Sequence, residues 1–86
     1  MSRIWRNDDY STEHIEGGML LYNNDDVLIF NETAAVIWEK IAKPIDVSDV
    51  ITELAQEYDS PHEEIEELTS QLLKKLQEVG VVTIED

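Results

Sequence analysis

The sequence predicts an α+β domain in which a small antiparallel β-sheet, built around a hairpin, is followed by three helices. Two apolar runs, Met19–Tyr22 and Val27–Phe30, flank a turn rich in asparagine and aspartate, which is typical of a β-hairpin. Three segments with helical periodicity follow, and prolines lie between them. A hairpin beside three helices indicates an architecture like that of a winged helix-turn-helix.

A length of 86 residues corresponds to one small domain spanning positions 1–86. Residues 1–11 are expected to form an N-terminal tail or an edge strand, with Trp5 anchored rather than free. A short strand is expected over Thr12–Ile15, and Gly17-Gly18 predicts a turn or bulge before the hairpin.

The strand Val27–Phe30 runs directly into the first helix, which we expect over Glu32–Ala42. Asn31 is a good N-cap because its side-chain oxygen can accept from the free N–H groups of the first turn. Lys43-Pro44 ends the helix, since the residue before a proline avoids helical geometry. A strand that turns directly into a helix fixes the angle between sheet and helices.

The second helix is expected over Val47–Tyr58, with Asp46 as its N-cap. The third begins at a capping box, in which Ser60 is the cap, Pro61 is the first helical residue and Glu63 closes the box. Gly80 can end this helix in left-handed geometry, and a short tail strand follows it. The predicted apolar stripe of the third helix comprises Ile65, Leu68, Leu72, Leu76 and Val79.

The net charge of −14 restricts the classes of partner. Such a field repels phosphate backbones and anionic membrane surfaces, so we expect no nucleic acid and no membrane partner, and a basic or neutral partner is favoured. No signal peptide and no apolar run approaching roughly 20 residues is present, which favours a cytoplasmic protein.

The usual signatures of catalysis are missing. The sequence has no cysteine, no glycine-rich phosphate loop and no zinc-protease motif, and its two histidines, His14 and His62, lack ligand spacing. The carboxylates at the start of the third helix suit the helix dipole, and Asn23–Asp26 fits a turn better than a calcium loop. We therefore expect no enzyme activity, no metal and no cofactor.

Four segments together resemble the PqqD-like family, the peptide-recognition domains (RiPP recognition elements) of natural-product biosynthesis from ribosomally made peptides. They are the hairpin, the run Phe30–Trp38, which looks like the family's "LNetaaaiW" segment, the second helix through Tyr58, and Leu72–Val82, which is similar to the closing "fLeeLeekGLi". The resemblance covers roughly Gly18 to Val82. Phe30 stands where leucine is usual, and Lys43-Pro44-Ile45 replaces an Asp-Gly turn.

The resemblance implies a non-catalytic peptide chaperone that binds the leader segment of a precursor peptide. Such domains deliver the peptide to a radical-SAM maturase or to a leader protease, in pyrroloquinoline quinone synthesis or in a lasso-peptide pathway. The leader adds as a strand to the sheet edge and packs against the third helix. The alternative is a winged-helix-like assembly or regulatory module without peptide specificity.

The resemblance places the peptide between the edge strand and the third helix. On the strand, Phe30 is expected in the core, so that Val27 or Ile29 faces the cleft. On the helix, Ile65, Leu72 and Leu76 are expected mainly in the core, and either the flank with Leu68, Gln71 and Lys75 or the flank with Thr69 and Leu73 contacts the peptide. The predicted peptide-binding residues are Val27, Leu28, Ile29, Phe30, Leu68, Thr69, Leu72, Leu73 and Lys75.

Overall fold

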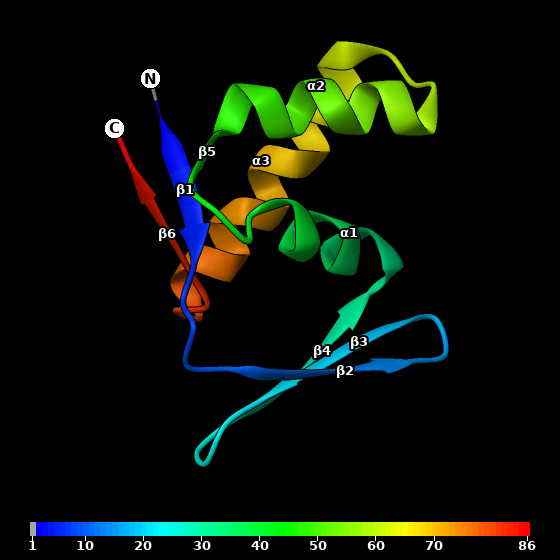
Figure 1. The fold of residues 1–86 in the computed structure, drawn as a ribbon. Coiled ribbons are helices and arrows are strands. Elements are labelled where there is room, and N and C mark those ends of the chain that lie inside the picture. Colours follow the sequence, from blue (N-terminus) through cyan, green and yellow to red (C-terminus); the bar gives the residue numbers. More distant parts are fainter. Residues whose placement is uncertain (1) are drawn as a thin grey trace.

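The structure is a computed structural model that describes residues 2–86, and within them it has three helices and two three-stranded antiparallel sheets (Figure 1). The predicted α+β class is confirmed. The helices are α1 (Glu32–Lys40), α2 (Val47–Tyr58) and α3 (His62–Glu78). The strands are β1 (Arg3–Arg6), β2 (Ser11–Ile15), β3 (Gly18–Tyr22), β4 (Val27–Asn31), β5 (Ile45–Asp46) and β6 (Val82–Glu85).

One sheet is a meander in the order β2-β3-β4, so the predicted hairpin is confirmed and gains β2 as a third strand. The Asn23 side-chain oxygen accepts from the N–H groups of Asp25 and Asp26 at 2.9 and 2.8 Å, which closes the β3–β4 turn. Gly17 has a φ of +80° in the β2–β3 turn, a backbone geometry that glycine adopts without strain. The turn residues therefore set the register of the meander.

The other sheet has the order β5-β1-β6, and β1 is its central strand. A tail or an edge strand was expected here. This prediction was wrong, because β5 pairs with one side of β1 and β6 pairs with the other. The sequence gives little indication of this pairing, because β5 and β6 are short and lie far from residues 3–6 along the chain. Figure 1 shows β1 and β6, from the first and last parts of the sequence, side by side in this sheet.

The helix boundaries confirm most predictions. Asn31 caps α1, accepting from the Ala34 N–H at 2.8 Å, but α1 ends at Lys40 and not at Ala42. The helix α2 spans the predicted residues, although the Asp46 side chain makes no capping hydrogen bond. The third helix differs at its start: Pro61 takes the cap position, and Ser60 Oγ donates to the Tyr58 carbonyl at 3.1 Å instead of capping. The predicted capping box is therefore absent.

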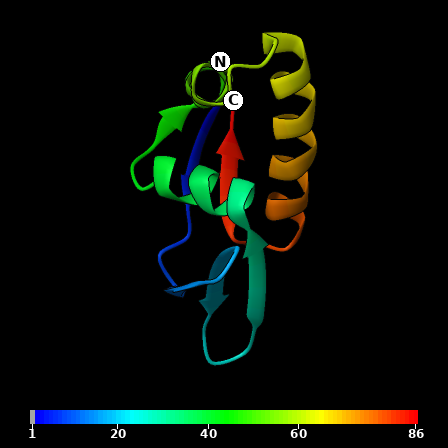
Figure 2. The same cartoon turned by 90° about the vertical axis from the view of Figure 1, so that its right-hand side faces the viewer.

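The core lies between the meander, the helices and the second sheet (Figure 2). Phe30 at the end of β4 and Trp38 in α1 pack edge to face, with ring centroids 5.8 Å apart. The Arg6 guanidinium lies 5.2 Å from the Trp38 ring and donates to the Trp38 carbonyl at 3.2 Å. Through Trp38, these contacts connect β1, β4 and the last turn of α1.

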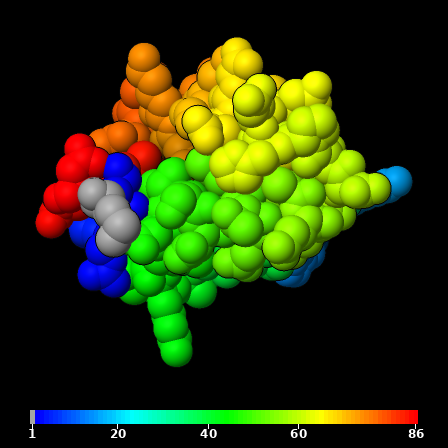
Figure 3. All heavy atoms as spheres, turned by 90° about the horizontal axis from the view of Figure 1, so that it is seen from above, coloured from blue at the N-terminus to red at the C-terminus, as the bar shows by residue number. Residues whose placement is uncertain are grey.

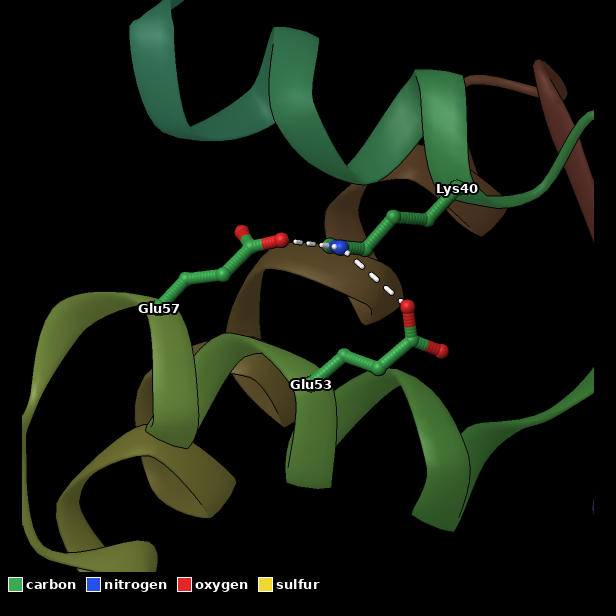
Figure 4. A network of polar contacts seen from close by, with 3 residues as sticks. All are labelled: Lys40, Glu53 and Glu57. Atoms are coloured by element: carbon green, nitrogen blue, oxygen red, sulfur yellow. Dashed lines mark hydrogen bonds and ion pairs between the residues drawn. The ribbon is translucent and has the colours of Figure 1, made fainter.

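A charged cluster joins α1 to α2 (Figure 4). Lys40 Nζ lies 2.7 Å from Glu57 and 3.3 Å from Glu53, and its side chain is 13% exposed. The hydrogen bond to Glu57 is the main cause that raises the pKa of Lys40 above its ordinary value, while burial opposes it.

Seen from above, α2 and the start of α3 form one continuous surface with β1 and β6 at its edge (Figure 3). Within residues 2–86, no helix is both long and apolar enough to cross a bilayer.

Candidate functional site

The strand β4 has one unpaired edge, because it is the last strand of the meander and pairs with β3 alone. An edge strand presents backbone N–H and C=O groups that can pair with another chain. Its side chains alternate: Phe30 is 6% exposed and faces the core, whereas Val27 and Ile29 are 66% and 75% exposed. The open edge therefore carries both backbone hydrogen-bonding groups and exposed apolar side chains.

A groove lies between α3 and the junction of β4 with α1. It has a volume of about 290 Å³. Figure 2 shows α3 running beside this junction. Asn31 ends β4 and caps α1, so the groove starts where the open edge ends. The lining residues, which define the groove from here on, are Asn31, Thr33, Leu68, Gln71, Leu72 and Lys75.

The groove continues into a hollow of about 170 Å³ between α1, α2 and α3. Thr33, Leu68 and Leu72 line both spaces, so the groove and the hollow adjoin, and together we call them the depression. The hollow is mainly apolar, with the polar groups of Thr33, Tyr58, Ser60 and Thr69 at its wall. A volume of this size suits a single side chain better than a small-molecule substrate, since ligand pockets are typically several hundred Å³.

The charge of the groove differs from that of the molecule as a whole. None of its lining residues, or of those lining the hollow, is acidic, although the protein has a net charge of −14. Lys75 is the cation of the groove, and within residues 2–86 its ammonium makes no ion pair. An exposed ammonium beside apolar side chains can pair with a carboxylate of a bound chain.

The structure separates the two flanks considered for α3. Leu68, Gln71 and Lys75 line the groove, whereas Thr69 and Leu73 are 4% and 2% exposed and belong to the core side. Thr69 reaches the wall of the hollow, but Leu73 lines neither space.

The buried stripe of α3 differs from the predicted one. It consists of Thr69, Leu73 and Leu76, while Ile65 and Leu72 are only half-buried and line the depression. Leu68 and Val79, both placed on the apolar stripe, are 63% and 54% exposed. The buried face of α3 is therefore rotated about the helix axis from the predicted one. Apolar residues spaced three and four apart lie on two neighbouring faces of this helix, so the spacing alone does not decide which face is buried.

The strand residues also fall into two groups. Leu28 and Phe30 face the core, and Val27 and Ile29 lie on the opposite face of the sheet. Neither Val27 nor Ile29 lines the groove or the hollow. A strand added beside β4 would have side chains next to both groups, because its residues also alternate between the two faces.

Sequence reasoning missed the part of the depression that comes from α1 and α2. Thr33 and Tyr58 line it but were treated as helix residues alone. The sequence carried one signal, because Tyr58 ends the apolar stripe of α2 with an amphipathic side chain, and in the structure this residue is 42% exposed. A tyrosine at the end of a helix commonly has an apolar ring in contact with the core and a wet hydroxyl.

The comparisons agree with the resemblance seen in the sequence. A family model described as coenzyme PQQ synthesis protein D (PqqD) matches residues 18–82. No curated protein and no solved structure matches the chain significantly. The match runs from the start of β3 through all three helices to the start of β6, and it includes the open edge and the groove. This chain therefore belongs to the PqqD family.

Proposed function

We propose that this protein is a non-catalytic adaptor, folded as one peptide-recognition domain, that binds the leader segment of a ribosomally made precursor peptide. The leader adds as a strand to the open edge of β4 and places side chains in the groove along α3. The adaptor then delivers the peptide to a modifying enzyme or to a leader protease. The observation that most supports this proposal is the groove, which starts where the unpaired edge of β4 ends.

The chemistry of the two surfaces supports this proposal. The β4 edge supplies backbone hydrogen bonds, which give affinity for any extended chain. The groove and hollow supply an apolar wall with Leu68 and Leu72, which selects particular side chains. Lys75 favours a leader with a carboxylate near the apolar anchor. Membership in the PqqD family supports the same non-catalytic, peptide-binding role.

The test is a fluorescence-polarisation titration of labelled leader peptides, taken from precursors encoded beside this protein, into the full chain. We expect saturable binding at micromolar concentration. Leu68→Asp should weaken binding at least tenfold, because a carboxylate replaces an apolar contact in the groove. Val79→Asp is the matched control. Val79, at the C-terminal end of α3, is also an exposed apolar residue, but it lies outside the groove.

Two further variants probe the strand and the charge. Ile29→Asp introduces a charge beside the added strand and should weaken binding as well. Lys75→Ala should weaken binding only of leaders that carry a carboxylate, and this effect should decline as salt concentration rises. A substitution of Leu73 is unsuitable, because Leu73 is buried and its loss would disturb the fold.

Absence of binding to every neighbouring leader would contradict the proposal. Equal effects of Leu68→Asp and Val79→Asp would also contradict it, because they would move the binding surface away from the groove. A tight homodimer that buries the β4 edge would favour an assembly module without peptide specificity.

A further inference from the structure

The meander has a second apolar surface, on the side that faces away from the helices. Cross-strand partners point to the same side of a sheet, so the register assigns each residue to a face. Leu20 pairs with Ile29, and Tyr22 pairs with Val27. Ile15 lies on the same side, next to Gly18. We call Ile15, Leu20, Tyr22, Val27 and Ile29 the outer face.

The outer face is exposed within residues 2–86. The other side of the sheet carries Met19, Leu21 and Phe30, which are 2%, 0% and 6% exposed. On the outer face, Ile15, Tyr22, Val27 and Ile29 are each between 38% and 75% exposed. Figures 1 and 2 agree that the helices lie on only one side of the meander. Neighbouring exposed apolar side chains of this size are typical of a surface that contacts another protein.

The charges around the outer face indicate what kind of protein covers it. Residues 11–31, which make up the meander, contain no lysine and no arginine. Glu13 points to the outer face through its pairing with Leu20. Glu16 lies in the β2–β3 turn at one end of the sheet, and Asp25 and Asp26 lie in the β3–β4 turn at the other end. The apolar surface thus has acidic groups within it and at both ends.

A second copy of this chain does not suit such a surface. A twofold interface sets the same face against itself, so two sets of carboxylates would meet with no lysine or arginine of the meander to neutralise them. The repulsion acts over the roughly 10 Å range in which charges are not screened. A partner with an apolar centre and a rim of lysine or arginine gains both from apolar burial and from charge pairing.

We propose that the outer face is the docking surface for the enzyme that receives the peptide, and that the enzyme meets it with an apolar patch rimmed by basic residues. This inference rests on the proposed function in that the partner is the receiving enzyme. The peptide then uses the β4 edge, next to Ile29, and the enzyme contact is centred on Ile15, Leu20 and Tyr22 of β2 and β3, away from that edge. Both can be occupied at the same time, which delivery of a bound peptide requires.

The test measures two affinities for each variant of the full chain. One is for the labelled leader peptide, and the other is for each purified modifying enzyme and leader protease encoded beside this protein, by biolayer interferometry. The variant Ile15→Ser/Tyr22→Ser removes apolar contacts from β2 and β3, away from the open edge of β4. We expect at least tenfold weaker enzyme binding and unchanged leader binding.

A charge reversal provides a second variant that leaves the apolar residues intact. Glu13→Lys should weaken enzyme binding at least threefold at low salt, with the difference shrinking as salt concentration rises. Glu64→Lys is the matched control, because it makes the same charge change on exposed α3, away from the meander. Circular dichroism identifies any variant that is unfolded.

The outcomes separate this inference from the proposed function. Loss of leader binding in Leu68→Asp with retained enzyme binding supports two distinct surfaces. Enzyme binding that is unchanged in both outer-face variants, or absent for every neighbouring enzyme, overturns the inference but leaves leader binding intact. A wild-type dimer in sedimentation equilibrium that Ile15→Ser/Tyr22→Ser dissociates would overturn it in favour of a second copy. Absence of leader binding by the wild type, with enzyme binding retained, would instead remove only the proposed leader-binding function.

Discussion

The two sheets of the molecule are assembled from the chain in opposite ways. The meander β2-β3-β4 joins neighbours in sequence through two tight turns. The sheet β5-β1-β6 joins residues near the start, the middle and the end of the chain. Ile4 in the centre of the second sheet is fully buried, whereas Ile29 at the edge of the first is 75% exposed. The second sheet thus has a buried central strand, whereas the first has one face in the core and leaves its β4 edge and its other face exposed.

The sharpest test of this comparison is an identical substitution in each sheet. Ile4→Ala removes a fully buried side chain between two partner strands and should lower the free energy of unfolding by about 3 kcal/mol. Ile29→Ala should change it by less than about 0.5 kcal/mol, because the side chain is already in water. Urea unfolding followed by circular dichroism measures both, and similar losses would contradict the division between the sheets.

The packing of β3 against β4 in the meander is most sensitive to a side chain at Gly18. A Cβ atom there would lie 1.9 Å from the Phe30 carbonyl oxygen, so the two strands would have to shift apart. We expect Gly18→Ala to cost about 2 kcal/mol, in the range of other overpacked sites. Gly17→Ala is the control: it meets no atom within 4 Å and should cost only about 1 kcal/mol, for its left-handed backbone. Thermal unfolding of both variants would show the order.

The junction between the meander and the helices depends on the cap of α1. Asn31→Ala removes the acceptor for the Ala34 N–H and should cost about 1 kcal/mol. Asp46 takes the same position before α2 but makes no side-chain capping bond, so Asp46→Ala should cost only a few tenths of that. An equal loss in chemical denaturation would mean that the Asn31 hydrogen bond contributes nothing specific.

The smallest effect is expected where α1 meets α2. Lys40→Met keeps the apolar stem but removes both ion pairs, and it should cost about 0.5–1 kcal/mol because Glu53 and Glu57 are half-exposed. The pKa of Lys40 is raised in the folded state, so its contribution is full below pH 10.5 and is lost as pH rises through the folded value. Stability curves of wild type and variant should therefore converge at strongly alkaline pH, and a constant gap would contradict this account.

The sequence predicted those parts of the fold that depend on local signals. The hairpin, the Asn31 cap and the bounds of α2 follow from residues close together in the chain. The central position of β1 could not be predicted, because its partner strands lie about 40 and about 80 residues away in the sequence and comprise only two and four residues. Long-range pairing leaves little periodicity in strands this short.

In the candidate site, too, features set by local sequence could be predicted, whereas features set by long-range packing could not. Leu68 and Lys75 were named as one of two possible flanks, and the choice between Leu68 and Leu73 depended on the rotation of α3 against the core. Leucine content alone does not give that rotation. The Lys40 cluster was missed, although Glu53 and Glu57 lie four residues apart on α2, a like-charge pair that favours a cation from elsewhere.

The central place of β1 also has a consequence during synthesis on the ribosome. Residues 3–6 emerge early but find one of their two partner strands only when residues 82–85 have been translated. The meander and the helices can form earlier, because their contacts are local. The nascent chain therefore passes through a stage in which its first strand and its apolar outer face are both exposed, and completion of the fold awaits the last strand of the sheet.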